Sequence, residues 1–536
     1  MADTQLIVLL SGAVSSGKTT LSNLLVKRFQ FERVKTKDVL RHHYPKAAND
    51  RKALQERGTY LDRKTNGTWV RDALVAHIQK TAPKYVLVDA VRIEKQVEEI
   101  RKSYGHRVFH IHLEAPIPLL ATRYKRRKVA GFKEFSKYSD VSRNETEGRV
   151  ARLAEIADTV IDTSRCTTDD VLVRAASHLG LYGDKQHSLV DVVVGGEYGS
   201  EGKGHIVSYL ARDYQLLIRV GGPNAGHKVF RFPEPYTHHQ LPSGTLFSDA
   251  KLLIGPGATL NVPALLNEIA DCDVTTERLF IDPQAMTIED RDIQAETKLV
   301  RTIGSTGQGV GAATARRILG RSAHGIRLAG QVPELQAFTR LTACEVLEEA
   351  YANRRKILLE GTQGTGLSIY HGKYPYVTSR DTTVGGLLSE TGIAPNRVRK
   401  VVMVCRSYPI RVESPAGGSS GPLSKEISWA DIADRSGIPE AELRRNERTS
   451  TTNRKRRVGE FEWDLLRKAA SLNGPTDIAL TFADYLGKDN TRARRFEQLT
   501  PATMRLAEEI ERVAGAPVSL ISTRFDLRSI IDRRAW

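Results

Sequence analysis

The chain has 536 residues, of which 40% are hydrophobic and 27% are charged. This length exceeds one ordinary hydrophobic core, so we expect a globular protein of two or three domains. No apolar run approaches the roughly 20 residues that span a bilayer, and the N-terminus lacks the basic segment of a signal peptide. These features predict a cytoplasmic protein with no membrane partner. The four cysteines lack metal-ligand spacing and indicate reduced thiols.

The net charge of +17 favours polyanionic partners, either nucleotides or nucleic acid. The densest basic run lies at residues 444–457 and contains no aromatic residue. It therefore lacks the stacking surface of single-strand binders, and we do not expect nucleic acid as a partner.

The first predicted strand, residues 6–10, leads into a glycine-rich loop and an amphipathic helix over residues 21–29. The loop reads G-x-x-x-x-G-K-T and contains Gly12, Gly17, Lys18 and Thr19. In such a loop the backbone N–H groups cradle phosphate, the lysine reaches the β and γ oxygens, and the threonine holds Mg²⁺. The segment predicts a nucleotide-binding P-loop.

A second predicted strand, residues 85–88, ends in Asp89, which would place a carboxylate near the metal ion. Alternatively, Asp89 makes a turn or cap at the strand end. The basic segment 123–128 has two interpretations as well, a solvated helix face or a lid that clamps phosphate.

These features, together with segments 35–41 and 157–162, resemble the nucleoside monophosphate kinase branch of P-loop proteins. By that resemblance, Asp38 and Arg41 would lie near the acceptor monophosphate. We expect a kinase-like domain over residues 1–181 with a parallel sheet. A polar connector over residues 182–188 separates it from a new α/β pattern over residues 189–536.

Eight ordered motifs follow this connector. They are GGEYGSEGKGH at 195–205, VGGPNAGHKV at 220–229, GSTGQGVG at 304–311, EGTQGTGL at 360–367, YHGKYPYVTSRDTT at 370–383, TTNRKRRVG at 451–459, TFADYL at 481–486 and ISTRFD at 521–526. The set closely resembles adenylosuccinate synthetase, in the compact form of the archaeal and phage branches. The resemblance implies a single larger α/β domain around a mostly parallel sheet.

The family joins aspartate to a 6-oxopurine nucleotide in two steps. A nucleoside triphosphate phosphorylates the purine O6, and the aspartate amine then displaces that phosphate. By the resemblance, Lys203 and the amides of Gly199, Gly202 and Gly204 would bind the triphosphate, which suits a glycine loop.

Two further motif residues match groups at the reacting atoms. His227 matches the acid that donates a hydrogen bond to the transferring phosphoryl group, and the carbonyl of Gly226 matches a metal contact. Gln363 matches the residue that contacts the purine ring, although a loop amide that bonds backbone is the alternative.

Substrate recognition is implied for a further set of residues. Those matching the monophosphate site are Asn224, Thr306 and Thr378, and those matching the aspartate loop are Thr452, Arg454 and Arg456. Arginine forks suit the two carboxylates of aspartate. The family also uses an arginine from a neighbouring subunit, which implies a homodimer. Counting residues from Gly311 puts that arginine at position 320, which is a glycine in this chain. Arg321 lies one place beyond, and Arg316 and Arg317 are the alternatives.

The donor site departs from the family pattern. A Lys-x-Asp element usually reads the guanine of GTP, but here Phe482 replaces the lysine while Asp484 remains. Ser522 is followed two places later by Arg524, where the family has glycine. ATP or dATP thereby becomes an alternative to GTP, although Phe482 could equally serve core packing.

Ser200 stands where the family usually carries an aspartate that acts as catalytic base and magnesium ligand. Serine is neutral at pH 7 and is a poor base without a partner. Phage aminoadenylosuccinate synthetases carry this replacement and accept dGMP, whose 2-amino group needs room. Our leading hypothesis is therefore a dGMP- or GMP-type substrate and an N6-succinyl-2-aminopurine product. The alternatives are an IMP-using synthetase with a P-loop appendage, or a nucleotide sensor that has lost catalysis.

Overall fold

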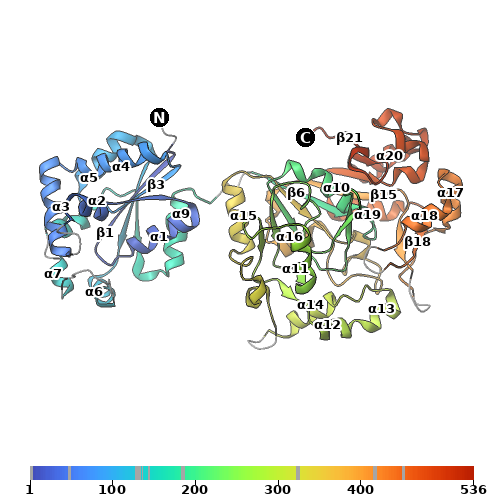
Figure 1. Ribbon diagram of the computed structural model, residues 1–536, viewed down its shortest axis with the longest axis horizontal. Helices are drawn as coiled ribbons and strands as arrows, with labels where there is room; N and C mark the ends of the chain where they lie inside the picture. The colour runs from blue at the N-terminus through green and yellow to red at the C-terminus, as the bar shows by residue number, and fades with distance from the viewer. Residues whose placement is uncertain are drawn as a thin grey trace. The chain divides into compact units, whose positions relative to one another are not determined.

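The computed structural model describes residues 4–45, 50–126, 135, 137–142, 145–182, 187–321, 326–413, 419–449 and 453–536 (Figure 1). The chain divides into two compact units, Met1–Tyr182 and Gly183–Trp536. The division falls within the expected connector, of which residues 183–186 lie outside the described part. No helix among the described residues is long and apolar enough to cross a membrane.

The first unit is built on a five-stranded parallel sheet of order β2-β3-β1-β4-β5. Its strands are β1 (Leu6–Gly12), β2 (Glu32–Lys35), β3 (Tyr85–Asp89), β4 (Val108–Glu114) and β5 (Thr159–Asp162). Both faces of β1 are buried, because Ile7 and Leu9 pack into one hydrophobic cluster while Val8 and Leu10 pack into another. A parallel sheet needs this two-sided cover, and the near-continuous apolar run of β1 reflects it.

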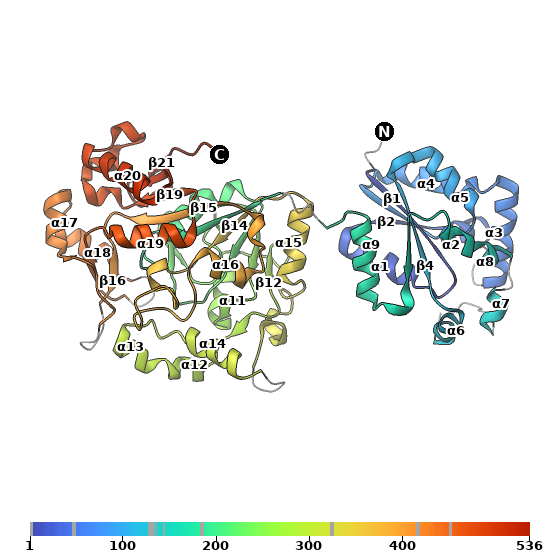
Figure 2. The same ribbon diagram turned by 180° about the vertical axis from the view of Figure 1, so that it is seen from behind.

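Helices cover the two faces of this sheet (Figure 2). Helices α1 (Lys18–Phe29) and α9 (Thr168–His178) pack on one face, and α4 (Thr68–Thr81) and α5 (Glu94–Tyr104) pack on the other. The remaining helices are α2 (Thr36–His43), α3 (Arg51–Thr65), α6 (Ile117–Arg126), α7 (Tyr138–Ser142) and α8 (Glu145–Val150).

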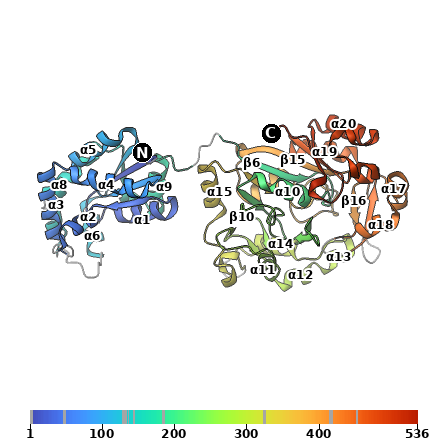
Figure 3. The same ribbon diagram turned by 45° about the horizontal axis from the view of Figure 1, so that its top comes forward.

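The second unit contains a nine-stranded sheet of order β12-β10-β7-β14-β6-β15-β19-β20-β21. Figure 3 labels its strands β6, β10 and β15. All neighbours are parallel except β20 and β21. The strands are β6 (Val190–Gly195), β7 (Leu216–Arg219), β10 (Lys251–Ile254), β12 (Leu279–Ile281), β14 (Ile357–Glu360), β15 (Val398–Arg406), β19 (Asp477–Thr481), β20 (Val518–Ser522) and β21 (Ile530–Asp532). The predicted α/β fold, with a parallel sheet in the first part and a larger one in the second, is confirmed.

Each face of the larger sheet has its own core. One cluster joins Val192 and Val194 of β6 to helices α15 (Ala343–Ala352), α16 (Val384–Thr391), α19 (Trp463–Asn473) and α20 (Pro501–Ala514). The opposite cluster joins Val193 to α10 (Lys203–Leu210) and α11 (Val262–Asp271). Strand β6 is buried along its whole length, which fixes the position of the glycine loop that follows it.

Smaller elements complete the second unit. They are the pairs β8 (His227–Val229) with β9 (Tyr236–His238) and β11 (Thr259–Leu260) with β13 (Met286–Thr287), the sheet of β16 (Ile410–Val412), β17 (Glu426–Ile427) and β18 (Arg456–Gly459), and helices α12 (Asp290–Ala295), α13 (Thr297–Ile303), α14 (Val310–Leu319), α17 (Trp429–Ser436) and α18 (Glu440–Asn446).

Candidate active sites

A cleft of about 810 Å³ opens where β1 and β3 of the first unit end, and Gly17, Lys18, Thr19 and Asp89 line it. The carboxyl ends of parallel strands are the usual place for ligands in α/β folds. The Lys18 ammonium donates to the carbonyls of Gly12 and Ala13, at 2.5 and 2.7 Å. The structure therefore brings the P-loop and the strand-end carboxylate of Asp89 to one cleft.

Gly12 has a structural part in this loop and does not line the cleft. Its φ is +131°, and a Cβ at this position would lie 2.1 Å from the carbonyl oxygen of Leu113. Only glycine allows β1 and β4 to approach this closely at the start of the loop.

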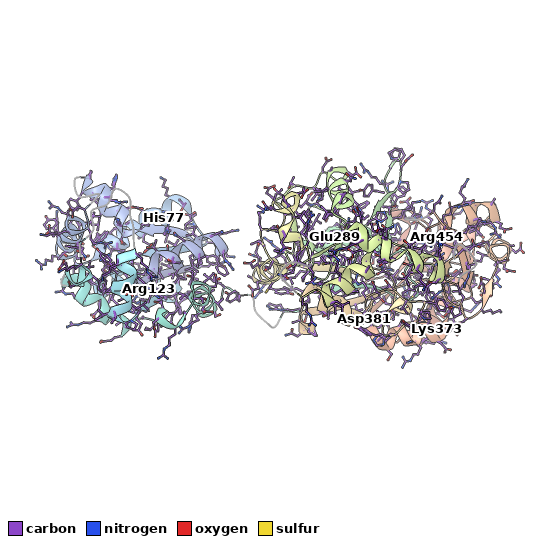
Figure 4. The ribbon with its side chains drawn as sticks, turned by 90° about the horizontal axis from the view of Figure 1, so that it is seen from below. His77, Arg123, Glu289, Lys373, Asp381 and Arg454 are labelled. Carbon is purple, nitrogen blue, oxygen red and sulfur yellow. The ribbon has the colours of Figure 1, made fainter. Side chains whose placement is uncertain are left out.

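Basic and polar side chains form the other walls of the first cleft. Its lining includes Asp38, Arg41, Arg51, Asp62, Trp69, Arg92 and Arg123. Asp62 accepts from the indole N–H of Trp69 at 2.7 Å, and burial raises the pKa of Asp62. Arg123 (labelled in Figure 4) donates to the hydroxyl and carbonyl oxygens of Thr163, both at 2.9 Å.

The basic segment 123–128 does not fit one interpretation alone, either as a solvated helix face or as a lid that clamps phosphate. Arg123 faces the cleft, whereas Lys125 and Arg126 are exposed, and Arg127 and Lys128 lie outside the described residues.

The second cleft, of about 980 Å³, lies where β6, β14, β19 and β20 end. The expected site residues that line it are Gly199, Ser200, Gly202, Lys203, Gly204, Asn224, Gly226, His227, Thr306, Gln363, Thr378, Arg456, Asp484 and Ser522. Arg321 and Arg454 do not line it, and Thr452 lies outside the described residues. Residues from motifs almost 330 positions apart thus meet in one cleft.

The glycine loop after β6 is held by Glu201. Its fully buried carboxylate accepts from the backbone N–H groups of Glu197 and Gly199, at 3.0 and 2.7 Å, and from the Lys203 ammonium at 2.6 Å. Lys203 reaches the cleft, whereas Glu201 is not among the lining residues. Glu201 therefore shapes the loop and does not line the cleft beside Ser200.

The Ser200 side chain lines the cleft and makes no hydrogen bond with the described residues. Its backbone carbonyl accepts from Arg406 at 3.2 Å. The buried Arg406 guanidinium also pairs with Glu447 at 2.9 Å and stacks on the Phe482 ring at 3.9 Å. Motif reasoning missed Arg406 and Glu447, since each lies outside the eight motifs and acts through contacts between distant segments.

His227 is oriented by Glu360, the first residue of the EGTQGTGL motif, whose role the sequence did not reveal. The Nδ1 atom of His227 forms a short hydrogen bond with the Glu360 carboxylate, which also accepts from the Ser243 backbone N–H at 2.7 Å. Burial raises the pKa of Glu360, but Arg219, His227 and Ser243 outweigh it and lower that pKa to about 2. Glu360 is therefore ionised, and the His227 Nδ1 atom is the donor.

The opposite ring nitrogen of His227, a residue that lines the cleft, forms no hydrogen bond with the described part of the protein. Its Nε2 atom is buried and has no hydrogen-bond partner among the described residues. Burial, with the nearby Arg219, lowers the pKa of His227 to about 4, although Glu360 acts in the opposite direction. The arrangement presents a neutral imidazole nitrogen, which becomes a donor when a bound anion raises the pKa.

Three buried side-chain oxygens of residues that line this cleft also lack partners among the described residues. They are the side-chain oxygens Oδ1 of Asn224, Oε1 of Gln363 and Oδ1 of Asp484. Such groups are rare in folded proteins because each forfeits its interaction with water. Three separate loops contribute them, which indicates that a polar ligand completes their hydrogen bonding.

The predicted aspartate loop meets the rest of the cleft through two arginines. Arg456 lines the cleft and pairs with Glu447 at 2.8 Å. Arg454 (Figure 4) instead donates to the backbone carbonyls of Gly304 and Ser305, at 3.1 and 3.2 Å. It therefore ties this loop to the segment that carries Thr306.

The candidates for the intersubunit arginine differ in their surroundings. Arg316 is bound within its own chain by Asp292 at 2.7 Å and Glu289 at 3.1 Å, and Arg317 donates to the Pro256 carbonyl at 2.9 Å. Arg321, just beyond α14, is exposed.

Known proteins resemble the second unit. The family model described as adenylosuccinate synthetase matches residues 192–338 and 332–491. The adenylosuccinate synthetase of Archaeoglobus fulgidus is 37% identical over 349 residues, covering 64% of this chain and 98% of that protein. That of Methanocaldococcus jannaschii is 37% identical over 352 residues, covering 64% and 96%.

Two solved structures have a similar fold. Fully ligated adenylosuccinate synthetase from Plasmodium falciparum superposes with a TM-score of 0.57 and 23% identity, covering 65% of this chain and 100% of that one. The succinoaminodeoxyadenylate synthetase of cyanophage S-2L, bound to dGMP and to dATP as energy donor, gives a TM-score of 0.55 and 25% identity, covering 65% and 96%.

Proposed function

Because the chain belongs to the adenylosuccinate synthetase family and its second unit is that of a ligase forming a C–N bond, we propose that it joins L-aspartate to dGMP or GMP. The product would be an N6-succinyl-2-aminopurine nucleotide. One observation carries this proposal: Ser200 lines the cleft, whereas the Glu201 carboxylate bonds the backbone of its own loop. The cyanophage protein, whose structure contains dGMP, supports the same substrate.

Room and charge beside the purine favour guanine. A hydroxymethyl group is smaller than a carboxymethyl group and carries no charge, so it leaves space for the 2-amino substituent that IMP lacks. The Ser200 hydroxyl has no protein partner among the described residues and is therefore available to this edge of the base. Gln363, whose Oε1 atom is also buried without a partner there, would bond the ring.

His227 would stabilise the transferring phosphoryl group. Its Nδ1–H is committed to Glu360, so its Nε2 atom donates only when the ring is doubly protonated. A bound triphosphate favours that form by its negative charge, and Glu360 stabilises it from the other side. The ring would thus take up a proton when the donor binds and keep it against the phosphoryl oxygens.

The remaining charge of the cleft suits its substrates. The substrate monophosphate would be held by Asn224, Thr306 and Thr378. The triphosphate would be bound by Lys203 and the loop amides, and a carboxylate of aspartate would be bound by Arg456. The basic run noted in the sequence contributes Arg445, Arg448 and Arg456 to the cleft, which supports a role for that charge in substrate binding.

The protein oxygens in either cleft would complete a Mg²⁺ site only together with oxygens of nucleotide phosphates. Among the described residues no cluster of three or more His, Cys, Asp and Glu side chains could hold a metal ion. Thr19 and Asp89 would hold Mg²⁺ in the first cleft, whereas Ser200 and the Gly226 carbonyl offer neutral oxygens in the second. Bound with nucleotide phosphates, the ion would neutralise charge on the transferred group.

A substrate comparison tests the ligase proposal. The purified chain is incubated with aspartate, ATP and either dGMP, GMP or IMP, and products are identified by mass spectrometry. We expect an aspartyl adduct of dGMP or GMP with release of phosphate. Turnover of IMP alone would contradict the guanine assignment and leave an IMP-using synthetase.

The first unit is proposed to be a nucleotide kinase. Lys18, Thr19 and Asp89 share its cleft with Arg41, Arg51, Arg92 and Arg123, a set that suits the phosphates of a donor and an acceptor. Transfer of labelled phosphate from ATP to a panel of nucleoside monophosphates tests this activity. Failure to label any acceptor would contradict it.

We also propose that the second unit works as a homodimer. Helices α12 to α14 expose the apolar side chains of Ile293, Leu299, Ile318 and Leu319, the last at 85% exposure. Arg321 follows this surface directly and is exposed, as a residue that reaches a partner's cleft must be. Molar mass by light scattering tests the assembly.

A further inference from the structure

The first cleft extends to both sides of the P-loop. In the sheet order β2-β3-β1-β4-β5 the P-loop follows the central strand β1, and further cleft residues follow β5 on one side and β2 and β3 on the other. Helices α3 and α9 accordingly lie on opposite sides of the first unit (Figures 1 and 2). Thr163, just after β5, donates to the Ser16 carbonyl of the P-loop at 3.2 Å. The P-loop is thus tied to the β5 side, and the β2–β3 side offers room for a second ligand.

One face of α3 forms a wall on the β2–β3 side. Its cleft residues recur at helical spacing and are Arg51, Leu54, Gln55, Gly58, Thr59 and Asp62. Gly58 lies inside the helix, where only proline is less favourable than glycine. A Cβ at Gly58 would meet only the Cδ1 atom of Leu40 within 4 Å, at 3.5 Å. The glycine therefore relieves no clash, and it leaves an apolar slot between α2 and α3 open to the cleft.

Asp62 stands on the same wall with one carboxylate oxygen bonded and one open. Its Oδ1 atom accepts from Trp69 Nε1 at 2.7 Å and from Gln96 Nε2 at 2.8 Å. Both partners line the same cleft. The Oδ2 atom of Asp62 has no hydrogen-bond partner among the described residues, and it is not closed to solvent. Asp62 therefore offers the cleft an oxygen whose direction is fixed by two N–H donors on the other oxygen.

The neighbours of Asp62 favour its ionised form. Burial raises the pKa of Asp62, whereas the hydrogen bonds from Trp69 and Gln96 limit that rise. The positive charges of Arg92 and Arg149 act in the same direction as these bonds. An ionised carboxylate has acceptors only, so its open oxygen matches a ligand edge that carries N–H donors.

We propose that this pocket holds the guanine base of an acceptor nucleotide, with Asp62 Oδ2 accepting from N1–H and from the 2-amino group. Guanine alone among the common bases has a ring N–H beside an amino group. Adenine and cytosine place a ring-nitrogen acceptor beside their amino groups, and uracil and thymine flank their N–H with carbonyls. Each of these would turn a lone pair toward the carboxylate. The apolar slot beside Gly58 suits the face of a planar ring.

This inference rests on the proposed kinase activity of the first unit and names its acceptor. The reaction moves the γ-phosphoryl group of ATP to a phosphate oxygen of GMP. The bond from that phosphorus to the β–γ bridging oxygen breaks and a bond to the GMP oxygen forms, so the products are ADP and GDP. The base takes no part in these bond changes, and Asp62 is therefore a specificity-determining residue.

Phosphate transfer from ATP to a series of monophosphates tests the choice of base. The full chain carries His227→Asn to silence the second unit, aspartate is omitted, and the diphosphate formed is identified by chromatography. We expect kcat/KM for GMP to exceed that for AMP at least tenfold. IMP lacks the 2-amino group and 2,6-diaminopurine riboside monophosphate lacks N1–H, so each should lie between the two. A preference for AMP or for a pyrimidine nucleotide overturns the proposal.

Asp62→Asn inverts the hydrogen-bonding character of the open position. The amide oxygen still accepts from Trp69 and Gln96, while the amide N–H₂ replaces Oδ2 and matches the N1 acceptor of adenine. We expect the ratio of kcat/KM for GMP to that for AMP to fall at least tenfold. Glu99→Gln is the matched control, because Glu99 pairs with Lys102 at 2.9 Å and does not line the cleft. An unchanged ratio in a folded Asp62→Asn chain overturns the proposal.

Gly58→Leu tests the same pocket without removing a polar group, and it serves if Asp62→Asn does not fold. Leucine favours the helix more than glycine does, so a loss of function would not come from unfolding of α3. We expect the KM for GMP to rise at least tenfold, because the side chain fills the slot that the base would occupy. Gly58→Ala is the control for size and should stay within about threefold of wild type. An unchanged KM in Gly58→Leu contradicts a base in this slot.

Amide hydrogen exchange distinguishes failure of this proposal from failure of the kinase proposal. GMP bound in the pocket should slow exchange over residues 51–69 in the wild-type chain and not in Asp62→Asn. Such protection without formation of GDP supports the guanine assignment and contradicts the kinase. Transfer to AMP or to a pyrimidine nucleotide alone supports the kinase and contradicts guanine. The absence of both transfer and protection contradicts both proposals.

Discussion

The Glu360 carboxylate binds the Nδ1 atom of His227, a residue that lines the cleft, and leaves Nε2 without a partner among the described residues. The two residues lie in motifs 133 positions apart, at the end of β14 and the start of β8. The pair resembles the base and orienting carboxylate of other acid–base sites, in which the carboxylate fixes the tautomer and stabilises the charged ring.

Glu360→Gln should therefore lower kcat for phosphate release by roughly a hundredfold, because a neutral amide no longer stabilises the charged imidazole. Nucleotide affinity should change little. The matched control is Glu268→Gln, since Glu268 pairs with the buried His238 at 3.0 Å away from the cleft. The control should reduce thermal stability and leave kcat near wild type. Equal kinetic losses in the two variants would show that Glu360 is only structural.

His227→Asn should suppress phosphate release by at least a hundredfold while the nucleotides still bind, because the amide keeps polarity but cannot carry a proton. Stopped assays of phosphate and equilibrium binding of dGMP measure the two effects separately. A variant that turns over within tenfold of wild type would remove His227 from the phosphoryl-transfer step.

Ser200→Asp places a carboxylate at the position of the Ser200 hydroxyl. We expect the ratio of kcat/KM for dGMP to that for IMP to fall at least tenfold, because the larger, charged group occupies the space of the 2-amino substituent. Ser200→Ala is the control for size, and it should keep the preference for guanine. An unchanged ratio in the aspartate variant would mean that another residue sets the choice of base.

Several of these residues could be found from sequence because their chemistry is local. The loops with Lys18 and Lys203 each follow a buried strand, and backbone spacing alone predicts a phosphate site there. Glu360, Arg406 and Glu447 could not be found this way. Each is a buried charge with at least one partner from a distant segment, so its role exists only once the sheet has assembled.

Arg454 shows the converse limit. Its motif predicts a substrate contact, which stays a prediction, and in the structure its Nη1 atom donates to the carbonyls of Gly304 and Ser305. A basic residue in a binding loop can serve the ligand or hold a neighbouring loop, and sequence spacing does not separate the two. Glu201 is similar, because a carboxylate beside Ser200 turns into its own loop.

Lys18→Ala should abolish the phosphate transfer that we propose for the first unit, because it removes the cation expected to reach the β and γ oxygens. Aspartate ligation, which we assign to the second cleft, should persist. Both activities are measured on the same preparation, by labelled phosphate transfer and by mass of the aspartyl adduct. Equal loss of both would contradict independent sites.

Arg321 should act in the cleft of a partner subunit, and mixing two inactive variants tests this. Arg321→Ala leaves every homodimer without the arginine, and His227→Asn leaves every homodimer without the acid. A mixed dimer contains one complete site, in which the Ala chain supplies His227 and the Asn chain supplies Arg321. Random pairing makes half of all dimers mixed, each with one working site of two.

Mixing should therefore restore about a quarter of the wild-type rate after subunit exchange, although each variant alone is nearly inactive. Arg317→Ala is the control, because Arg317 bonds its own chain at the Pro256 carbonyl. If Arg317→Ala lowers the rate, mixing it with His227→Asn should give no more than the average rate of the two separate proteins. The absence of recovery for Arg321→Ala, with dimers verified by light scattering, would show that the arginine acts within its own subunit or not at all.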